Sequence, residues 1–585
     1  MENYKFKVDL KGIIRLLSDN LYSSEDVFLR EVLQNAVDAI KARKKAEPDF
    51  KEGEIRITSI NENKERKIII EDNGVGLTEE EMHSFLSVIG FSSKSAEEGR
   101  KTFIGQFGIG LLSCFLVAEK IKVVSRSIRE EKTYQWLGHS DGTYQVQEEP
   151  EEREPGTTVY LTLKGSMYKK YKEAKILELL SAYAFLLQYP VIYQNEDGEQ
   201  RVNDAYIPWR QSFCTKETIM EFGKNVFEEE FFDVISLNGE NVKGYAFVSL
   251  SPMTPTSTQE HKIFLKNMFV TDNEKDLIPQ WAFFTKCIVN TENLTPTASR
   301  ESFAKDYQLM KAKHEIEKSI FDYFVSLSQY DAEKLKQITR IHNLAIKSLA
   351  AEQEEIFRLF FPFLTFSTNK GTMAGFQIVE AAKKMPVYYC VDVEDFGRIS
   401  PLIKNSGGLL VNGGYVYDCH LIEQAEKIYK GVKFTIFEEA LYEDLLETPA
   451  AKIVSEMESL MGCAKEILNA CNCGVSLKAF SPKELPALYV PGEDLFLGKT
   501  MSSSSFSTFF EGFSFEEQEE HSTKLYINSN NALIKKIAKL TDQEKMKTIL
   551  QILYVQAMMT GHYTLGEQEM NLLENGIGRL IEYGL

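Results

Sequence analysis

The first third of the chain alternates between helical and strand-like spacing of its apolar residues. Residues 26–44, DVFLREVLQNAVDAIKARK, carry apolar positions at helical spacing with no glycine or proline, which predicts a strong helix. The segments expected beside it are strands at 54–60 and 67–72, a helix at 111–118, and strands at 121–127 and 157–164. This order predicts an α/β layer structure.

The rest of the chain mixes strands with helices and ends in helical sequence. Strand-like residues at 262–270 and helical residues at 307–327 predict a second α/β region, and 544–559 predict a late helix. Polar or acidic stretches near 190–200 and at 437–450 suggest domain boundaries. We therefore expect an α+β protein with domains at 1–196, 197–436 and 437–585.

Composition narrows the class of protein. A length of 585 residues calls for several domains, and 43% hydrophobic residues exclude a disordered chain. The net charge of -19 opposes binding to nucleic acid. The chain shows no signal-peptide pattern, no apolar run of the ~18 residues needed to span a membrane, and cysteines without disulfide-like spacing. We expect a cytoplasmic protein with no nucleic-acid or membrane partner, and ordinary thiols at Cys463, Cys471 and Cys473 rather than a metal site.

The first predicted helix carries a polar stripe of Glu31, Asn35 and Asp38, which fall within about 60° of one another at helical spacing. Apolar residues flank the stripe on one side, and Arg30, Gln34 and Lys41 flank it on the other. The stripe is therefore expected at the seam between core and solvent, where a cleft can open. The edge of an ordinary surface helix would show the same pattern.

Asp72 ends an apolar strand and is followed by Gly74 and Gly76. Asp-Asn-Gly is a common signal for a hairpin turn, so a plain turn is one interpretation. A carboxylate at a buried strand end could instead accept a hydrogen bond from the amino group of a purine, with Gly76 letting the backbone approach the ring. The pattern leaves both open.

A glycine-rich loop, IGQFGIG at 104–110, stands directly before the second predicted helix. Gly105, Gly108 and Gly110 would expose backbone N–H groups at the positive end of that helix, which suits an anion. The loop differs from a P-loop because no Gly-Lys-Ser/Thr follows, and it lacks the strand and acidic residue of a dinucleotide fold.

Taken together, the acidic/Asn helix, the DxGxG turn and the GxxGxG loop resemble the GHKL ATPase superfamily. The strings FLREVLQNAVDAIKAR, IEDNGVGLT, IGQFGIGLLSCFLVA and GTTVYLTLK are similar to the HtpG-type chaperones of the 90-kilodalton heat-shock family. The resemblance implies a GHKL α/β sandwich domain, an α/β middle domain and a mostly helical dimerisation domain. It implies a homodimer that hydrolyses ATP with magnesium and closes on partly folded client proteins.

The resemblance also assigns roles to residues of the first domain. Glu31 matches the catalytic glutamate, Asn35 the magnesium ligand, and Asp72 the adenine-reading aspartate. Asp38 matches a position near the pocket. The remaining positions matched to nucleotide contacts are Gly76, Lys94, Gly105, Gln106, Phe107, Gly108, Gly110 and Thr157.

Two later segments extend the resemblance. Residues 262–301 are similar to a middle-domain segment ending in Ser-Arg-Glu, which implies that Arg300 reaches the γ-phosphate. By residue chemistry alone, the preferred interpretation of Arg300 is a surface residue that pairs with Glu301 or Asp306. Near the C-terminus, an apolar face on the helix at 544–559 could pack across a two-fold axis or within one chain; it consists of Ile549, Ile552, Leu553, Gln556 and Met559.

Some features depart from the family pattern or leave function open. The segment between Ile89 and Ile104 is shorter than usual, and Ala304 stands where many relatives carry glutamine.

Phenylalanines in the Ser/Phe-rich stretch 501–515 could bind client proteins or belong to an ordinary loop; they are Phe506, Phe509, Phe510, Phe513 and Phe515. The alternative functions are a nucleotide-gated interaction protein without significant hydrolysis, or another GHKL ATPase such as a histidine kinase or a mismatch-repair or topoisomerase ATPase.

Overall fold

The computed structural model forms two compact units, Met1–Asp331 and Ala332–Leu585. It describes residue 12 and residues 22–62, 65–86, 110–195, 198–203, 206–254, 256–257, 260–438, 440–491, 523–561 and 563–584. Lys94, Gly105, Gln106, Phe107 and Gly108 lie outside the described residues, as do the five phenylalanines of 501–515. The domain boundaries near 197 and 437 stay predictions.

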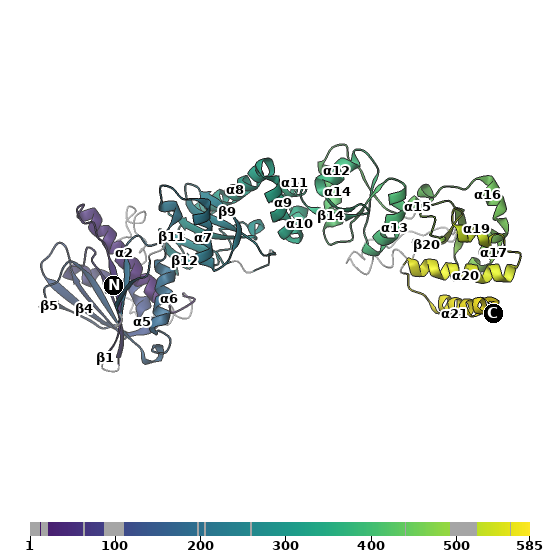
Figure 1. The fold of residues 1–585 in the computed structure, drawn as a ribbon. Helices are drawn as coiled ribbons and strands as arrows, with labels where there is room; N and C mark the ends of the chain where they lie inside the picture. The colour runs from purple at the N-terminus through teal and green to yellow at the C-terminus, as the bar shows by residue number, and fades with distance from the viewer. Residues whose placement is uncertain are drawn as a thin grey trace, which may run out of the picture. The chain divides into compact units, whose positions relative to one another are not determined.

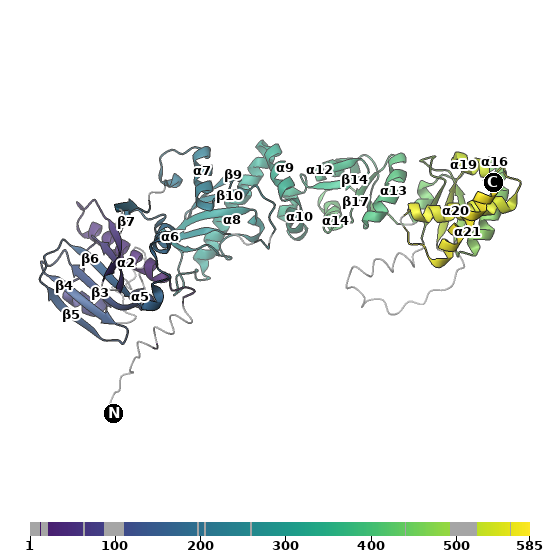
Figure 2. The same ribbon diagram turned by 60° about the horizontal axis from the view of Figure 1, so that its bottom comes forward.

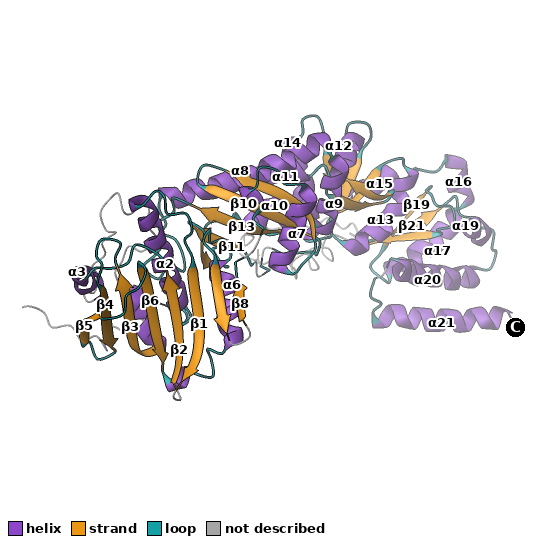
Figure 3. Ribbon diagram, turned by 60° about the vertical axis from the view of Figure 1, so that its left-hand side comes forward, coloured by secondary structure: helices purple, strands orange, loops and turns teal. Residues whose placement is uncertain are grey.

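The first unit begins with an eight-stranded sheet in the order β5-β4-β3-β6-β2-β1-β7-β8. Helices α2 (Val27–Ala46), α5 (Gly110–Val117) and α6 (Glu173–Ala184) pack on one face, and α2 and α6 lie behind the sheet in Figure 3. The strands are β1 (Ile55–Glu62), β2 (Glu65–Asp72), β3 (Ala118–Arg126), β4 (Thr133–His139), β5 (Tyr144–Glu149), β6 (Gly156–Leu163), β7 (Val191–Asn195) and β8 (Gly198–Arg201). The helices and strands predicted for this region are confirmed within a few residues.

Strand register brings the polar residues of this sheet together. Asp72 at the end of β2 pairs with Thr157 of β6, and Thr157 pairs with Ser125 of β3. Alternate residues of β2, including Ile68, Ile70 and Asp72, are buried toward the helices. Because neighbouring residues in register point to the same face, Asp72, Thr157 and Ser125 all face α2. After Asp72 the chain enters α3 (Glu79–Glu81), so the turn here does not form the hairpin that Asp-Asn-Gly often signals.

The second sheet of this unit has the strand order β12-β11-β13-β10-β9. Its elements are α7 (Lys216–Phe227), β9 (Phe231–Asn238), β10 (Val242–Ser249), β11 (Lys262–Leu265), β12 (Met268–Thr271), β13 (Thr285–Thr291) and α8 (Tyr307–Tyr330). Helix α8 packs against β9 and β10, as Figure 2 shows. The predicted strand at 262–270 is divided by a turn, because Lys266 and Asn267 both adopt positive φ and reverse the chain. The segment between β13 and α8 carries Arg300.

The second unit starts with helices and a five-stranded sheet in the order β15-β14-β17-β16-β18. The helices are α9 (Ala332–Ile341), α10 (Asn343–Glu352), α11 (Glu354–Phe360), α12 (Gly375–Ala382), α13 (Val393–Asn405), α14 (Asp418–Ile428) and α15 (Ala440–Leu445). The strands are β14 (Thr365–Thr368), β15 (Gly371–Ala374), β16 (Val387–Cys390), β17 (Leu409–Asn412) and β18 (Phe434–Ile436). Parallel pairing of β16 with β17 and β18 makes this part α/β.

The end of the second unit surrounds a three-stranded sheet, β19-β21-β20, with helices. Its elements are α16 (Ala451–Glu456), α17 (Glu458–Asn469), β19 (Gly474–Lys478), β20 (Ala487–Val490), β21 (Lys524–Asn528), α19 (Ala532–Ile537), α20 (Gln543–Thr560) and α21 (Glu567–Gly584). Helices α20 and α21 lie side by side (Figure 1). Leu553 faces the core and Ile552 meets Gly576 of α21, whereas Gln556 and Met559 are exposed. Packing within the chain therefore uses part of the apolar face predicted on α20.

The mixed helix and strand content confirms the α+β prediction. All eight cysteines lie in the described residues as free thiols, and five of them are buried. None of the helices that the structure describes combines the length and apolar character needed to cross a bilayer.

Candidate functional site

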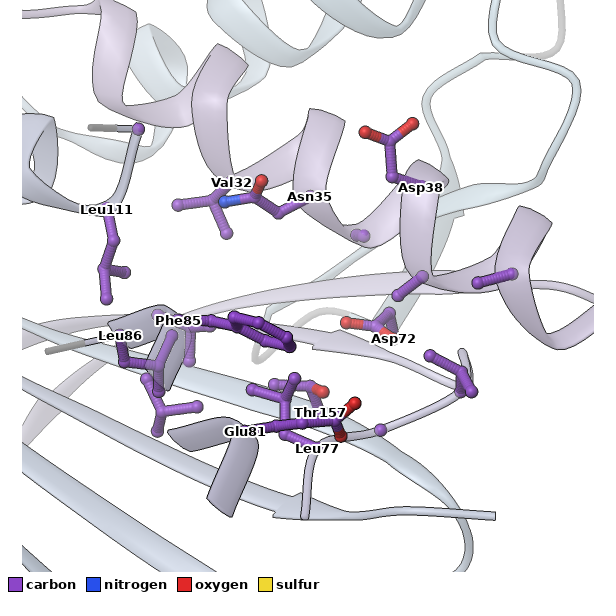
Figure 4. A pocket seen from close by; sticks show the side chains of 18 of the residues that line it. Val32, Asn35, Asp38, Asp72, Leu77, Glu81, Phe85, Leu86, Leu111 and Thr157 are labelled. Atoms are coloured by element: carbon purple, nitrogen blue, oxygen red, sulfur yellow. The ribbon is translucent and has the colours of Figure 1, made fainter. Parts of the chain in front are cut away.

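A cavity of about 570 Å³ opens between α2 and the first sheet. Figure 4 shows Val32, Asn35 and Asp38 on the α2 side and Asp72 and Thr157 opposite. The described residues that were predicted for the site all line it: Glu31, Asn35, Asp38, Asp72, Gly76, Gly110, Thr157 and Arg300. Segments far apart in the sequence thus meet around one space of nucleotide size.

One end of the cavity contains Asp72, which is 8% exposed, beside a hydrogen-bonded group centred on the Ser125 hydroxyl. Asp72 Oδ1 accepts a hydrogen bond from the Gly74 amide at 2.9 Å. The Ser125 hydroxyl donates to the Gly156 carbonyl at 2.9 Å, lies 2.9 Å from the Thr157 hydroxyl, and accepts from the Leu77 amide at 2.9 Å. These bonds fix a carboxylate and a hydroxyl next to each other at the cavity wall.

The backbone of the Asp72–Leu77 turn is held against its neighbours. Gly76 has φ +67°, and a Cβ on it would lie 1.8 Å from the Arg126 carbonyl oxygen, so only glycine fits there. The Val75 amide donates to the Ala39 carbonyl, and Arg43 Nη1 donates to the Asn73 and Pro155 carbonyls at 2.9 and 3.1 Å. Helix α2 therefore holds the turn directly, and Arg43 links the turn to the residue that precedes β6.

The other end of the cavity contains Glu31 and Arg300, which come from opposite ends of the first unit. Arg300 Nη1 donates to Glu31 Oε2 at 2.5 Å and to Gln34 Oε1 at 2.7 Å. Glu31 is 2% exposed and Arg300 is 6% exposed, so this is a buried ion pair. Arg300 has φ +58°, a left-handed conformation that costs energy for a residue with a side chain.

The segment that carries Arg300 is fastened to α2. Arg30 donates from Nη1 to the Arg300 carbonyl at 3.0 Å and from Nη2 to the Ser299 carbonyl at 2.7 Å. The Ser23 hydroxyl donates to Glu301 Oε1 at 2.6 Å. Arg30 and Gln34, which the helical pattern placed on the solvent side of the polar stripe, are 3% and 1% exposed. That prediction was wrong because a segment almost 270 residues later covers this face of α2.

The charge at this end lies on the Glu31, Arg300 and Arg30 side chains, and Arg30 Nη2 is 3.7 Å from Glu31 Oε1. Burial, and then the neighbouring Glu31 carboxylate, raises the pKa of the Tyr22 hydroxyl and of the Cys114 thiol. Both groups therefore stay neutral at physiological pH. A Cβ on Gly110, the first residue of α5, would lie 2.7 Å from Glu31 Oε2, so glycine lets the start of α5 approach the carboxylate.

Sequence reasoning missed several residues that build the site. Ser125 is a buried hydroxyl in a strand whose other inward residues are apolar, and that break in the alternation was a usable signal. Glu81 and Arg129 form a 2.6 Å ion pair at the cavity wall, and nothing in the local sequence links them. Gln34 offers no signal either, because its partner Arg300 is remote in sequence.

Comparison with known proteins matches two separate parts of the chain to family models. A family model described as "Histidine kinase-, DNA gyrase B-, and HSP90-like ATPase" matches residues 22–159. A second model, "Hsp90 protein", matches residues 246–392. The first covers α2, the Asp72 turn and Thr157, and the second covers the segment that carries Arg300.

Similar proteins extend the match to the rest of the chain. A protein named "Chaperone protein HtpG" from Borrelia garinii subsp. bavariensis is 26% identical over 95% of this chain and 96% of its own length. A protein of the same name from Borreliella afzelii is 26% identical over the same shares of the two chains. Another from Sulfurovum sp. is 27% identical over 64% of each chain. Together, the two family models, the relatives that match almost the whole chain and the geometry of the cavity support an HtpG-like chaperone of the Hsp90 type, an ATP-dependent molecular chaperone with ATPase activity.

Proposed function

We propose that the cavity holds ATP with its base at the Asp72 end and its triphosphate at the Glu31 end. The observation that carries this proposal is the shared cavity itself, which joins Asp72 and Thr157 at one end to Glu31, Gly110 and Arg300 at the other. Asp72 would accept a hydrogen bond from the amino group of adenine, and the Ser125–Thr157 hydroxyl pair lies beside it because Thr157 is opposite Asp72 in the sheet. Asp38 and Gly76 also line the cavity wall and would contact the nucleotide there.

Asn35 is the residue that fits a magnesium ion at this site. It is an exposed side chain on a helix that is otherwise largely buried, and it faces the cavity (Figure 4). A neutral amide oxygen is a suitable ligand for a hard cation that keeps several of its waters. When bound, the ion would neutralise part of the phosphate charge. Glu31 lies one helical turn away from Asn35 on the same helix.

Glu31 and Arg300 take the chemical roles in this proposal. Glu31 would accept the proton of the attacking water, and Arg300 would donate hydrogen bonds to the γ-phosphate. In the present arrangement Arg300 Nη1 engages Glu31 Oε2, so Arg300 has to leave this oxygen before Glu31 can use it as a base. A nucleotide-gated interaction protein without hydrolysis would need neither side chain.

An Arg300 series tests the assignment in the full chain. Arg300→Ala removes the guanidinium group that would donate to the γ-phosphate. We expect turnover to fall by ~100-fold or more, with ATP affinity little changed. Arg300→Lys is the matched control. It keeps the positive charge but lacks the planar guanidinium with its several donors, and it should retain more activity than Arg300→Ala. Magnesium-dependent phosphate release gives turnover, and calorimetry gives affinity. Unchanged turnover in Arg300→Ala would remove Arg300 from the reaction.

We further propose that ATP binding and hydrolysis drive clamp closure on partly folded client proteins in the cytoplasm. The names of the HtpG relatives and the two family matches support the chaperone activity. The free state of all eight cysteines fits a reducing compartment. Crosslinking to a client from a photoreactive residue placed at Phe509 would test whether the 501–515 stretch takes part.

A homodimer through the C-terminal region is the assembly we propose, with α21 as its contact surface. Met570, Ile577 and Ile581 lie on one stripe of α21 and are 45%, 46% and 58% exposed. A second copy would cover this stripe by two-fold symmetry. Light scattering should therefore show a dimer that Ile577→Lys converts to monomer, while Asn575→Lys, off the stripe, should leave the dimer intact. A wild-type monomer would overturn the assignment.

A further inference from the structure

Gln34 is a buried amide with one well-defined contact. It follows Glu31 by three residues on α2, so both side chains lie on the same side of the helix. Its Oε1 accepts a hydrogen bond from Arg300 Nη1 at 2.7 Å. Its Nε2 has no hydrogen-bond partner within the residues that the structure describes. At 1% exposure, Gln34 contributes to this site chiefly as an acceptor for Arg300.

The same nitrogen of Arg300 serves both Gln34 and Glu31. Arg30 holds the backbone of the Arg300 segment by two carbonyl contacts, and neither of them involves the Arg300 side chain. The guanidinium can therefore change partners while its segment stays attached to α2. The positive φ of Arg300 shows that the surrounding contacts impose this backbone conformation.

We propose that Gln34 is a positioning residue that holds Arg300 in a resting place on Glu31, and thereby lowers the rate of ATP hydrolysis. This inference rests on the proposed roles of Glu31 and Arg300. The resting arrangement and the reactive one exclude each other, because Arg300 Nη1 cannot donate its two N–H groups to Glu31 Oε2 and Gln34 Oε1 and also donate to the γ-phosphate. A contact made only in the resting arrangement stabilises it selectively, so it reduces the population that can react.

The hydrogen bond between Arg300 and the Gln34 amide is of a kind that can be broken when Arg300 changes partners. A neutral amide gives Arg300 one charge-assisted hydrogen bond, which is weaker than a second ion pair would be. The γ-phosphate offers several charged oxygens and can compete successfully for the guanidinium. A glutamate at position 34 would put two carboxylates on Arg300 and should make its release slower.

Two variants at position 34 test this inference in the full chain. Gln34→Met keeps the length and removes the acceptor, and we expect turnover at saturating ATP to rise roughly three- to tenfold. Gln34→Glu should lower turnover by a similar factor. KM for ATP should move less than turnover in both variants, because Gln34 does not line the cavity. Lower or unchanged turnover in Gln34→Met would overturn the inference.

The same variants in an Arg300→Ala chain separate positioning from a structural effect. If Gln34 acts through Arg300, neither variant changes the residual turnover in that background, measured with radiolabelled ATP. An equal change in both backgrounds would mean that Gln34 acts through the fold and would overturn the inference. If the methionine variant folds poorly, Gln34→Ser takes its place. The serine side chain is too short to reach Arg300, so turnover should rise in this variant as well. Arg300→Ala alone tests the proposed function: if it lowers turnover while Gln34→Met does not raise it, only the inference about Gln34 fails.

Discussion

The two ends of the cavity are built in different ways. At the Asp72 end, contacts come from adjacent strands and one turn, and Ser125, Thr157 and the Leu77 amide satisfy one another. At the Glu31 end, partners come from segments about 270 residues apart, and Glu31 Oε1, Gln34 Nε2 and Arg30 Nε have no hydrogen-bond partner in the described part of the chain. Buried polar groups in a fixed network are normally paired. We infer that the Asp72 end is preformed for binding and that the Glu31 end changes partners during the reaction.

This contrast predicts that variants at the Glu31 end alter turnover and variants at the Asp72 end alter affinity. The largest effect is expected for Glu31→Ala, because it removes the general base: turnover should fall ~100- to 10,000-fold. ATP binding should survive, since Glu31 meets Arg300 rather than the base-binding wall. Phosphate release and calorimetry on the same preparation measure both quantities. Normal hydrolysis would show that the base is another residue.

Asp72→Asn should have the next largest effect, and on affinity. The amide puts a donor where adenine also presents a donor, so ATP affinity should fall roughly 10- to 100-fold. Glu71→Gln, an exposed neighbour on the same strand, is the matched control and should bind ATP as the wild type does. Equal affinity in both variants would place the base elsewhere.

Ser125→Ala should weaken ATP binding by roughly three- to tenfold, because it removes a hydroxyl that links Thr157, Gly156 and Leu77. Turnover at saturating ATP should stay the same, since Ser125 is not at the Glu31 end. A fall in turnover with unchanged affinity would break the proposed division between the two ends.

The smallest effect is expected for Arg129→Ala. Arg129 is paired with Glu81 at the cavity wall, but its side chain is 56% exposed, and such pairs contribute little and are screened by salt. ATP affinity should change by about twofold at low salt and less at high salt. A larger loss that persists at high salt would mean that Arg129 touches the nucleotide directly.

The same two ends explain what the sequence could and could not predict. Asp72, Gly76 and Thr157 lie on regular strands and a glycine turn, so periodicity and spacing located them. Glu31 and Asn35 followed from helical spacing, although Arg30 and Gln34 were assigned to solvent. Helical periodicity describes one helix and carries no information about a segment that packs on it from Ser299 and Arg300. The hairpin at Lys266 and Asn267 was missed because Asn267, a residue that favours turns, stands alone within an otherwise apolar, strand-like run.

A structure of the full chain with magnesium and a non-hydrolysable ATP analogue would show whether the nucleotide fills the cavity and whether Arg300 changes partners. We expect the base at Asp72, the phosphates beside Asn35 and Gly110, and Arg300 moved from Glu31 and Gln34 to the γ-phosphate. A cavity left empty between Asn35 and Asp72 would contradict the binding site, and a bound analogue with Arg300 still on Glu31 would contradict the exchange of partners.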